Sequence, residues 1–382
     1  MKIAIIHDYF IQNGGAEKVI ESLLELYPNA DLYTSVYVPD FFKNNYYTNR
    51  IYEQGSIKTT FLNKIFSDNQ KPSKYIKFNK HLYWLYPFAM VTHKVKGYDL
   101  VLISSTYCAK NVRLGANNKL VHYCHSPTRF LHGLVTEKDH STLPLWQRIV
   151  SGIILNPILK IIDLAAVKNL VKKNCIWVAN SKFIRTTIND VYHVDSDVIY
   201  PPVNINTFSN VKRTDDVQDF YLCHGRISFH KRLDLAILAC LKLDRKLIIS
   251  GQTLLESDMK NLKSLVPYDK QYLIQFLGRT SDETLHSLVK ECKAMLFPGK
   301  EDAGIAPIEL LAAGVPVIAY KSGGALEYIQ DGVNGVFFET QDVTSLEKAI
   351  LRFEQESFDI KKIKNSVLKF SNEEFKKLIQ EI

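Results

Sequence analysis

The sequence is poor in the features that mark several specialised classes of protein. Its six cysteines stand singly among 382 residues, and no two of them have the spacing of a metal site or a redox motif. We therefore expect reduced, buried thiols, as in a protein of the cytosol. The start of the chain lacks an apolar run long enough for a signal peptide, because Ile3–Ile6 leads at once into His7 and Asp8.

Long hydrophobic runs are also scarce. The longest, Ile149–Val167, is interrupted by Asn156-Pro157, Lys160 and Asp163, so we expect that it does not span a bilayer.

Motifs for metals and for nucleoside triphosphates are missing too. No P-loop is present, and Asp195-Ser196-Asp197 is an isolated acidic pair that carries little weight. His122, His125 and His132 do not form a metal site, because no acid or cysteine completes the set.

The composition is that of a folded protein with two or three domains, at 46% hydrophobic and 23% charged residues. The formal charge of +8 is uneven. Residues 1–200 hold 24 Lys and Arg against 15 Asp and Glu, a net +9, whereas residues 201–382 hold 24 against 25, a net −1. We expect the first half to meet an anionic partner.

Short apolar runs alternate with helical patterns along the whole chain, which predicts an α/β fold with parallel sheets. In the first half the predicted strands are residues 3–7, 30–37, 99–104, 120–124, 176–179 and 198–200. In the second half they are residues 220–224, 247–250, 273–277, 294–297 and 317–320. Pro201-Pro202 is rigid, so we place the linker between two domains there.

The most informative stretch is Phe297–Glu327, which predicts strand, loop, helix, strand, loop and helix. Pro307 suits a first helical turn, and Gly323-Gly324 opens the second helix. Two helix N-termini would then meet at the carboxyl edge of a parallel sheet, where free N–H groups favour a phosphate. Glu301 and Glu309 would repel a bare phosphate, but they could accept hydrogen bonds from sugar hydroxyls beside it. A nucleotide sugar fits both features.

A further loop has the residues of a diphosphate site, and two other glycine-containing loops lie at strand ends. Gly225-Arg226 follows a strand, and Lys231-Arg232 opens the next helix, so a guanidinium and an ammonium can neutralise a diphosphate. Gly278-Arg279 ends a later strand, near where a nucleotide base would lie. Gly14-Gly15 precedes the first helix of the chain and permits close backbone approach, although a tight turn explains a glycine pair equally well.

Glu301, seven residues, and then Glu309, followed by Ala312–Ile318, resemble the retaining glycosyltransferases of the GT-B fold, family 4. The whole phrase Phe297–Glu327 is most similar to bacterial GDP-mannose-dependent mannosyltransferases of O-antigen and capsule synthesis. His125–Phe130 resembles the same subgroup. One departure is Ala303, where the family usually has an aromatic residue.

The resemblance implies two Rossmann-like domains facing each other across a cleft. These are residues 1–198 for the acceptor and 199–358 for the nucleotide sugar, with a helix at 359–382 that packs back on the first. It implies transfer of a hexose from GDP-mannose to a lipid-linked glycan, without a metal. The implied catalytic residues are His125, Arg226, Lys231 and Glu301. The implied donor-binding residues are Gly14, Gly15, Arg226, Lys231, Gly278, Arg279, Glu301, Gly304, Ile305, Ala306 and Glu309.

The stretch Lys58–Lys96 combines eight lysines with eight aromatic residues and one acid, Asp68. Such a mixture suits an anionic membrane surface or single-stranded nucleic acid, and it also suits a solvated basic face over core aromatics. Because a lipid-linked acceptor is met at a membrane, we expect peripheral association of the first domain with the cytoplasmic face of the membrane and no nucleic acid partner.

Three alternative functions are compatible with the sequence. The first is transfer from a UDP-sugar by the same fold. The second is a sugar-nucleotide epimerase, which needs no acceptor. The third is a basic nucleic-acid-binding protein, which would leave Glu301 and Glu309 without a role.

Overall fold

The computed structural model describes residues 1–11, 14–39, 42, 46–66, 82–116, 118–134, 150–213, 218–253 and 256–382. These residues form two compact units. The first extends to Pro202 and also includes Lys376–Ile382, and the second comprises Val203–Phe375. Each unit is described by itself below.

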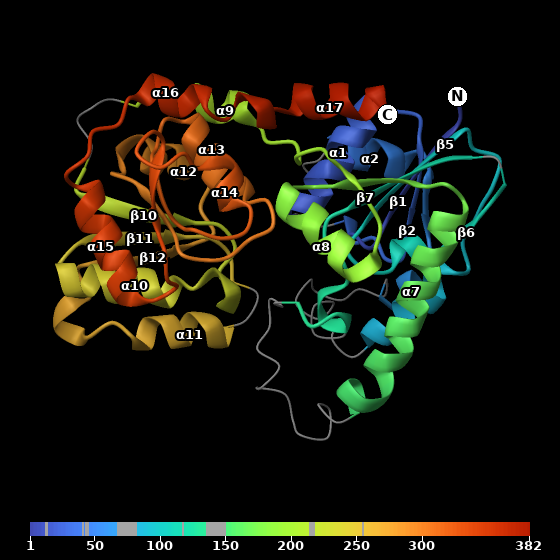
Figure 1. Ribbon diagram of the computed structural model, residues 1–382, viewed down its shortest axis with the longest axis horizontal. Coiled ribbons are helices and arrows are strands. Elements are labelled where there is room, and N and C mark those ends of the chain that lie inside the picture. Colours follow the sequence, from blue (N-terminus) through green and yellow to red (C-terminus); the bar gives the residue numbers. More distant parts are fainter. Residues whose placement is uncertain are drawn as a thin grey trace. The chain divides into compact units, whose positions relative to one another are not determined.

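The first unit is built on a seven-stranded sheet in the order β3-β2-β1-β5-β7-β8-β9, and all of its strand pairs are parallel (Figure 1). The strands are β1 (Ile3–His7), β2 (Asp31–Thr34), β3 (Ile57–Thr59), β5 (Leu100–Ser105), β7 (Lys119–Cys124), β8 (Ile176–Ala179) and β9 (Asp197–Val198). A separate pair joins β4 (Lys94–Val95) to β6 (Arg113–Leu114).

The main helices of this unit are α1 (Gly15–Leu26), α2 (Tyr46–Glu53), α3 (Phe61–Phe66), α5 (Tyr86–Met90), α7 (Asn156–Lys172) and α8 (Lys182–Tyr192). Ser181 caps α8, since its hydroxyl accepts from the backbone N–H of Ile184 at 3.1 Å. Helix α7 continues upstream through π-helical turns at Val150–Leu155. Asn156-Pro157 interrupts the apolar run in the sequence but does not interrupt the helix.

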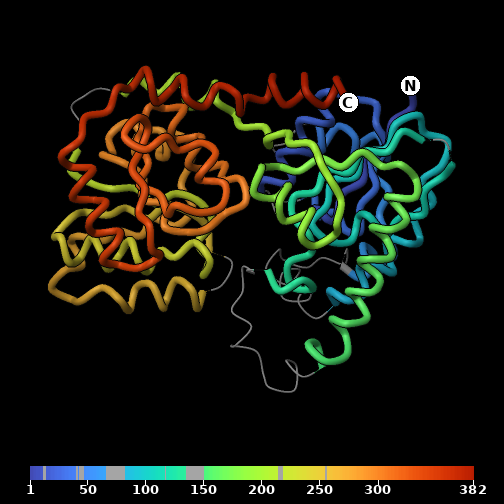
Figure 2. The backbone as a smooth tube through the Cα atoms, viewed as in Figure 1, coloured from blue at the N-terminus to red at the C-terminus, as the bar shows by residue number. Residues whose placement is uncertain are grey.

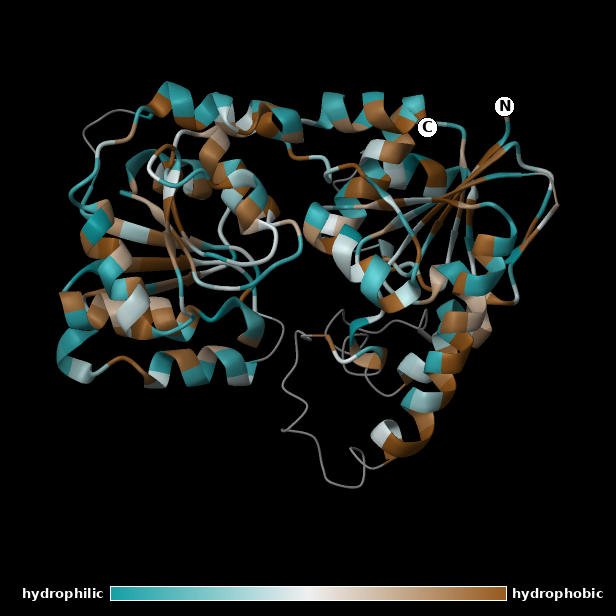
Figure 3. Ribbon diagram, viewed as in Figure 1, coloured by the Kyte–Doolittle hydropathy of each residue, from teal (hydrophilic) through white to brown (hydrophobic). Residues whose placement is uncertain are grey.

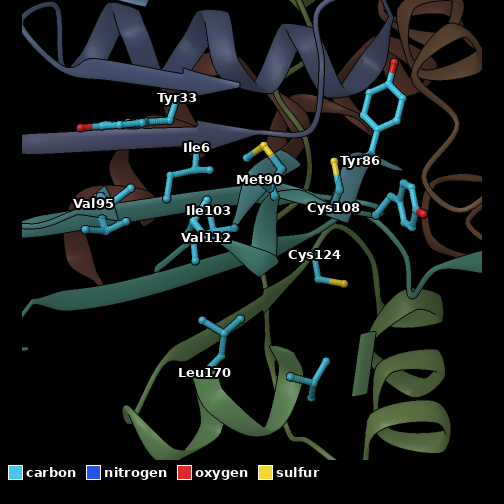
Figure 4. Close-up of a cluster of buried hydrophobic side chains, with 14 of the residues drawn as sticks. Ile6, Tyr33, Tyr86, Met90, Val95, Ile103, Cys108, Val112, Cys124 and Leu170 are labelled. Atoms are coloured by element: carbon cyan, nitrogen blue, oxygen red, sulfur yellow. The ribbon is translucent and has the colours of Figure 1, made fainter. Parts of the chain in front are cut away.

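The core of the first unit lies between the sheet and its covering helices. Side chains from β1, β5 and β7 meet residues of α5 and α7 there, including Ile6, Ile103, Met90 and Leu170 (Figure 4). Cys108 and Cys124 are buried in the same cluster as free thiols, in agreement with the expected reduced cysteines.

The second unit has a six-stranded parallel sheet in the order β12-β11-β10-β13-β14-β15. The strands are β10 (Phe220–His224), β11 (Lys246–Ser250), β12 (Ile274–Gly278), β13 (Met295–Phe297), β14 (Val317–Tyr320) and β15 (Gly335–Phe338). In Figure 2 the backbone of this unit runs from yellow-green at β10 to orange at β14. The strand order reverses between β10 and β13, which is where α/β sheets bind ligands.

The helices of the second unit are α9 (Ile205–Ser209), α10 (Leu233–Leu243), α11 (Glu256–Ser264), α12 (Asp282–Glu291), α13 (Ile305–Ala312), α14 (Ala325–Tyr328), α15 (Val343–Phe353) and α16 (Ile360–Asn365). The last helix, α17 (Asn372–Glu381), ends in the first unit, where Lys376 pairs with Glu25 at 2.5 Å. The predicted α/β class with two Rossmann-like, parallel-sheet domains is confirmed.

Candidate active site

The switch point of the second sheet is formed by two loops. One follows β10 and contains Gly225, Arg226 and Lys231, and the other follows β13 and contains Glu301 and Gly304. Arg226, Lys231 and Glu301, predicted to hold the diphosphate and the hexose of a donor, therefore lie at the carboxyl ends of two adjacent strands.

Glycines allow these loops to approach each other. Gly225 has φ +125°, and its N–H donates to the carbonyl of Ser250 at 3.0 Å. A Cβ on Gly299 would lie 2.9 Å from the Cα of Lys231, so only glycine permits this packing of one loop on the other. Lys231 ends a single 3-10 turn, Phe229–Lys231, which places its side chain over the loop after β13.

Lys231 and Glu301 form an ion pair through Nζ and Oε1. Their side chains are only 13% and 19% exposed. Burial alone would raise the pKa of the Glu301 carboxyl, but Lys231, with His230 and Arg226 further away, holds it below its usual range. The site thus contains a carboxylate that stays ionised at neutral pH, paired with Lys231 and near Arg226. The sequence prediction assigned these residues to separate parts of a donor, and it missed their contact.

The backbone of Glu301 is also held. Its carbonyl accepts from the N–H of Gly324 at 2.8 Å, and a Cβ on Gly323 would overlap the same carbonyl. Gly304, with φ +71°, packs against the buried ring of Tyr328 from α14. The Tyr328 hydroxyl makes no hydrogen bond to any residue that the structure describes. An aromatic ring therefore reaches this loop from α14, although Ala303 itself has none.

Helix α13 begins at Ile305, directly after Gly304, so the N–H groups of Ile305 and Ala306 lie at its first turn. Pro307 occupies that turn as predicted, and Glu309 follows with its residue 7% exposed. The second predicted helix N-terminus contributes less, because α14 has only four residues and its dipole is correspondingly small.

Gly278 and Arg279 lie at the same edge of the sheet but at the end of β12, two strands from β10. Gly278 has φ +67°, and its carbonyl accepts from the N–H of Gly251 at 2.7 Å. Arg279 is exposed. The structure brings this pair to the correct edge of the sheet without placing it beside Lys231 and Glu301.

The first unit has an equivalent switch point between β1 and β5, and one carboxylate occupies it. Asp8 follows β1 directly, and its two oxygens accept from the backbone N–H groups of four successive residues after β5. These are Thr106 at 2.7 Å, Tyr107 at 3.0 Å, Cys108 at 2.7 Å and Ala109 at 2.7 Å. Burial opposes the charge of Asp8, but His7, these N–H groups and Lys110 lower its pKa below the ordinary value.

His125 lies at the end of β7 in this unit and is 7% exposed. Its Nε2 is 2.8 Å from the hydroxyl of Ser104, which is 3.3 Å from Nδ1 of His7. Nε2 of His7 is 3.9 Å from Glu17, and Glu17 accepts from the N–H of Gly14 at 2.9 Å. A buried polar chain therefore joins the predicted histidine to the predicted Gly14-Gly15 turn.

Burial lowers the pKa of His125 to about 3, with His7 adding to the effect, so its imidazole is neutral at physiological pH. Its neighbour His122 also has a pKa of about 3, again mainly because of burial, and its Nε2 lies 2.9 Å from the hydroxyl of Ser105. His125 is thus suited to hydrogen bonding and not to carrying charge.

Asp8, Ser104 and Glu17 were not predicted from the sequence as parts of the first unit's loop network. A signal was present for Asp8, since a polar residue directly after a buried strand tends to lie at the ligand-binding edge. A signal was present for Glu17 too, because a glutamate three residues after the N-cap of a helix can accept from the N-cap N–H, as it does from Gly14. Ser104 gave no such signal, because its partners His7 and His125 are distant in the chain.

The basic and aromatic stretch Lys58–Lys96 falls only partly within the described residues, since 67–81 are not described. Lys58 is tied to Asp31 at 2.9 Å, and Tyr86 is a core residue at 1% exposure. Phe61 and Phe88, in contrast, are exposed at 46% and 48%. This stretch therefore supplies both core and surface. Four of its lysines, Lys71, Lys74, Lys77 and Lys80, lie outside the described residues.

Comparisons with known proteins agree with this geometry. Residues 204–369, nearly the whole second unit, match the family model described as Glycosyl transferases group 1. The chain is 29% identical over 289 residues to the alpha-1,3/1,6-mannosyltransferase ALG2 of Homo sapiens. That match covers 68% of this chain and 65% of the human protein, so the chain spans less than two thirds of this relative.

Solved structures resemble the whole chain. HepE of Anabaena, in complex with UDP, has a TM-score of 0.67 at 17% identity and covers 100% of this chain and 99% of its own. WaaG, a glycosyltransferase involved in lipopolysaccharide biosynthesis, has a TM-score of 0.60 at 13% identity, with 99% of both chains covered. The chain has the GT-B fold of glycosyltransferases. Its second unit is similar to the group 1 glycosyl transferases, and the curated proteins that the chain resembles include mannosyltransferases.

Proposed function

We propose that this protein is a retaining glycosyltransferase that moves mannose from GDP-mannose onto a lipid-linked glycan acceptor in the synthesis of a bacterial surface polysaccharide. The observation that supports it best is the buried Lys231–Glu301 pair at the switch point between β10 and β13. This pair places a cation and a carboxylate side by side, as the diphosphate and the hydroxyls of one nucleotide sugar require.

Lys231 and Arg226 would hold the diphosphate, and the N–H groups of Ile305 and Ala306 at the start of α13 would add neutral donors. Charge develops on the diphosphate as the glycosidic bond breaks, so these groups stabilise the leaving group more in the transition state than in the ground state. In this proposal no metal is required, because the cations and the helix N-terminus carry that charge.

Glu301 would accept a hydrogen bond from a hydroxyl of the hexose, and Glu309 from the ribose. The low pKa of Glu301 keeps it an acceptor across the physiological range. Lys231 would bridge Glu301 and the diphosphate, which would set the hexose at a defined distance from its leaving group. Retention would follow from attack on the same face, with the leaving phosphate taking the acceptor's proton.

His125 would contact the hexose or the reacting centre from the first unit. Its neutral imidazole can donate or accept a hydrogen bond without adding a second positive charge. The polar chain through Ser104 and His7 would hold the ring in one orientation.

Mannose is supported by the similarity to ALG2 mannosyltransferases, and a lipid-linked acceptor by the involvement of WaaG in lipopolysaccharide biosynthesis. A UDP-sugar is the second candidate for the donor, since the HepE structures contain UDP and UDP-glucose. A sugar-nucleotide epimerase of the same fold is a third possibility, which a requirement for an acceptor would exclude. We place the enzyme at the inner face of the cell membrane.

A donor screen tests the proposal. GDP and GDP-mannose should raise the melting temperature of the protein more than UDP and UDP-sugars do. Transfer should then require GDP-mannose and a lipid-linked acceptor, and it should persist in excess chelator. Equal stabilisation by UDP-sugars would overturn the donor assignment. Conversion of the sugar nucleotide without any acceptor would show an epimerase. Binding of single-stranded nucleic acid that falls steeply with salt would favour a basic nucleic-acid-binding protein.

A further inference from the structure

The helix that runs from Val150 to Lys172 has an unusual surface. Among the described residues it is the one helix long and apolar enough to cross a membrane by length and composition. Only 22% of its apolar 18-residue segment is buried, however. Its first nine residues, 150–158, include no buried residue. In Figure 3 the lower part of α7 shows brown, apolar residues on its surface. A core helix of a folded domain would hide these side chains.

One face of this helix is firmly attached to the first unit. Leu159, Val167 and Leu170 belong to the hydrophobic core. Asp163 on the same face pairs with Lys110 at 2.7 Å, and both side chains are 2% exposed. Asp163 also accepts from the hydroxyls of Thr128 and Tyr192, both at 2.8 Å, and lies 3.0 Å from His132. These contacts set the rotation of the helix about its own axis.

The opposite face is apolar at its beginning and basic at its end. Ile154, Ile158 and Ile161 follow one another at spacings of four and three residues, so they share a stripe, and they are 53%, 49% and 68% exposed. Lys168 and Lys172 continue the same stripe and are exposed. The first lysine lies seven residues beyond Ile161, about 10 Å along the axis at about 1.5 Å per residue.

Further apolar groups adjoin the start of the helix. Ile153 is 71% exposed. The hydroxyl of Tyr83 donates to Asn156 at 3.2 Å, and the residue after Tyr83 is Trp84, 36% exposed. Single exposed apolar residues are common on soluble proteins, but a grouped set of isoleucines with an aromatic residue beside it marks an interaction surface.

The order of these groups along the helix matches a lipid surface. Isoleucines at a tip enter the boundary between headgroups and acyl chains to a depth of about 5–10 Å, and lysines about that distance behind them meet anionic headgroups. The net positive charge of residues 1–200 also favours an anionic surface. A spanning helix does not fit, because the buried Asp163–Lys110 pair and the core residues keep the second half of the helix in the protein.

We propose that the outer stripe of this helix, Ile153, Ile154, Ile158, Ile161, Lys168 and Lys172, is the surface by which the protein docks on an anionic lipid bilayer. The inner face of the helix bonds to Thr128 and His132, three and seven residues after His125. Docking would therefore bring the loop of His125 to the membrane, where a lipid-linked acceptor lies. That last step rests on the proposed function, whereas the docking itself does not.

The experiment is flotation of the full chain with vesicles of phosphatidylglycerol and phosphatidylcholine, compared with phosphatidylcholine alone. The wild type should float with the anionic vesicles only, and less so as salt is added. A variant with Ile153, Ile154, Ile158 and Ile161 all changed to serine should lose at least tenfold in vesicle affinity. K168E/K172E should lose binding at low salt. The matched control is L326S/L351S/L368S, which changes three exposed leucines of the second unit and should float as the wild type does.

Two further measurements keep the outcomes distinct. The serine variant should keep its melting temperature and its shift with GDP, which shows that it folds and that its donor site is intact. It should lose transfer to an acceptor in vesicles but keep transfer to a short-chain acceptor in detergent. If the wild type floats as described but no donor supports transfer, the proposed function fails and the docking surface stands.

Three results would overturn the proposal. The serine variant could float as well as the wild type, which would place the lipid contact elsewhere. The wild type could ignore anionic vesicles and sediment as a dimer that the serine variant abolishes, which would make this face a contact between two copies. Bound protein could resist an alkaline carbonate wash, which would show insertion across the bilayer.

Discussion

The two sheets have the same strand order around their switch points, but the groups found there differ. In the first unit Asp8 accepts hydrogen bonds from four successive backbone N–H groups, so the anion position is filled by the protein's own carboxylate. In the second unit the corresponding loops hold Lys231 and Glu301, which are paired, and Arg226 is a further cation near them. The first switch point is satisfied internally, and the second has positive charge to offer to a ligand.

We infer from this difference that the two switch points have different roles. A carboxylate buried with four N–H donors is rigid and stabilises the loop that it joins. Glu301 positions the ammonium of Lys231, and an ammonium has three donors, so it can also contact a phosphate. We therefore expect substitutions at the first switch point to act on stability, and those at the second to act on binding and transfer.

The largest effect is expected from Asp8→Ala. The substitution leaves buried N–H groups without acceptors, and it should lower the free energy of unfolding by at least about 3 kcal/mol. Urea denaturation followed by circular dichroism measures this. Asp195→Asn is the control, since Asp195 pairs with Arg185 at the surface and is 81% exposed. The comparison between the two units fails if Asp8→Ala is as stable as the control.

Glu301→Gln should act on transfer more than on stability. Glutamine keeps the size of the side chain but weakens the acceptor for a hexose hydroxyl, so transfer should fall roughly 100-fold, the scale of losing one charged hydrogen bond in a transition state. Affinity for GDP should change little, because GDP has no hexose. Steady-state kinetics and calorimetry separate the two effects, and equal losses in both would contradict the role given to Glu301.

Lys231→Ala should weaken GDP binding about tenfold, since a charge-assisted hydrogen bond contributes about 1.5–3 kcal/mol. Lys242→Ala is the matched control, because Lys242 lies in the same unit, is 60% exposed and pairs with Glu347 away from the switch point. Calorimetry with GDP gives both values. An unchanged affinity in Lys231→Ala would remove this lysine from the diphosphate site.

The last prediction concerns the dependence of stability on acid. The pKa of His122 is about 3 in the folded protein against an ordinary 6.5, so between these values the unfolded chain binds a proton that the folded chain does not. Stability should therefore fall as the pH drops below about 6.5, by up to about 1.4 kcal/mol per pH unit for each such histidine. His122→Gln should make the slope shallower in urea titrations at pH 6 and pH 4. An unchanged slope would mean that His122 is not held neutral by burial.

Much of the fold was accessible from the sequence because it depends on local pattern. The apolar run before His7 and those before Gly225 and Pro298 predicted β1, β10 and β13, and the glycines after them predicted tight loops. The second predicted strand, 30–37, was too long, since the ladder ends at Thr34 and the N–H of Ser35 bonds to the carbonyl of Asp8 instead. Such an exchange of partners depends on a residue 27 positions away, which no local pattern contains.

The helix at Val150–Lys172 is a second feature that the local sequence pattern did not predict. In the sequence the apolar run Ile149–Val167 is interrupted by Asn156-Pro157, Lys160 and Asp163, yet one continuous helix passes through all of them. Proline lacks one N–H and clashes only with the preceding turn, and the π-helical turns before Asn156 accommodate it. Which of its isoleucines face water was decided by the attachment of Asp163 to Lys110, a contact across 53 residues of chain.

By itself the sequence determined the α/β class, the alternation of strands and helices, and the loops in which Arg226, Lys231, Glu301 and His125 lie, because these follow from hydrophobic periodicity and from glycine and proline positions. Only the tertiary structure decided which charges meet. The Lys231–Glu301 pair, the chain from His125 to Gly14 and the capture of four N–H groups by Asp8 all join segments that are separated in sequence. Burial then sets their protonation, since the cost of a charge depends on the surroundings that the whole fold creates.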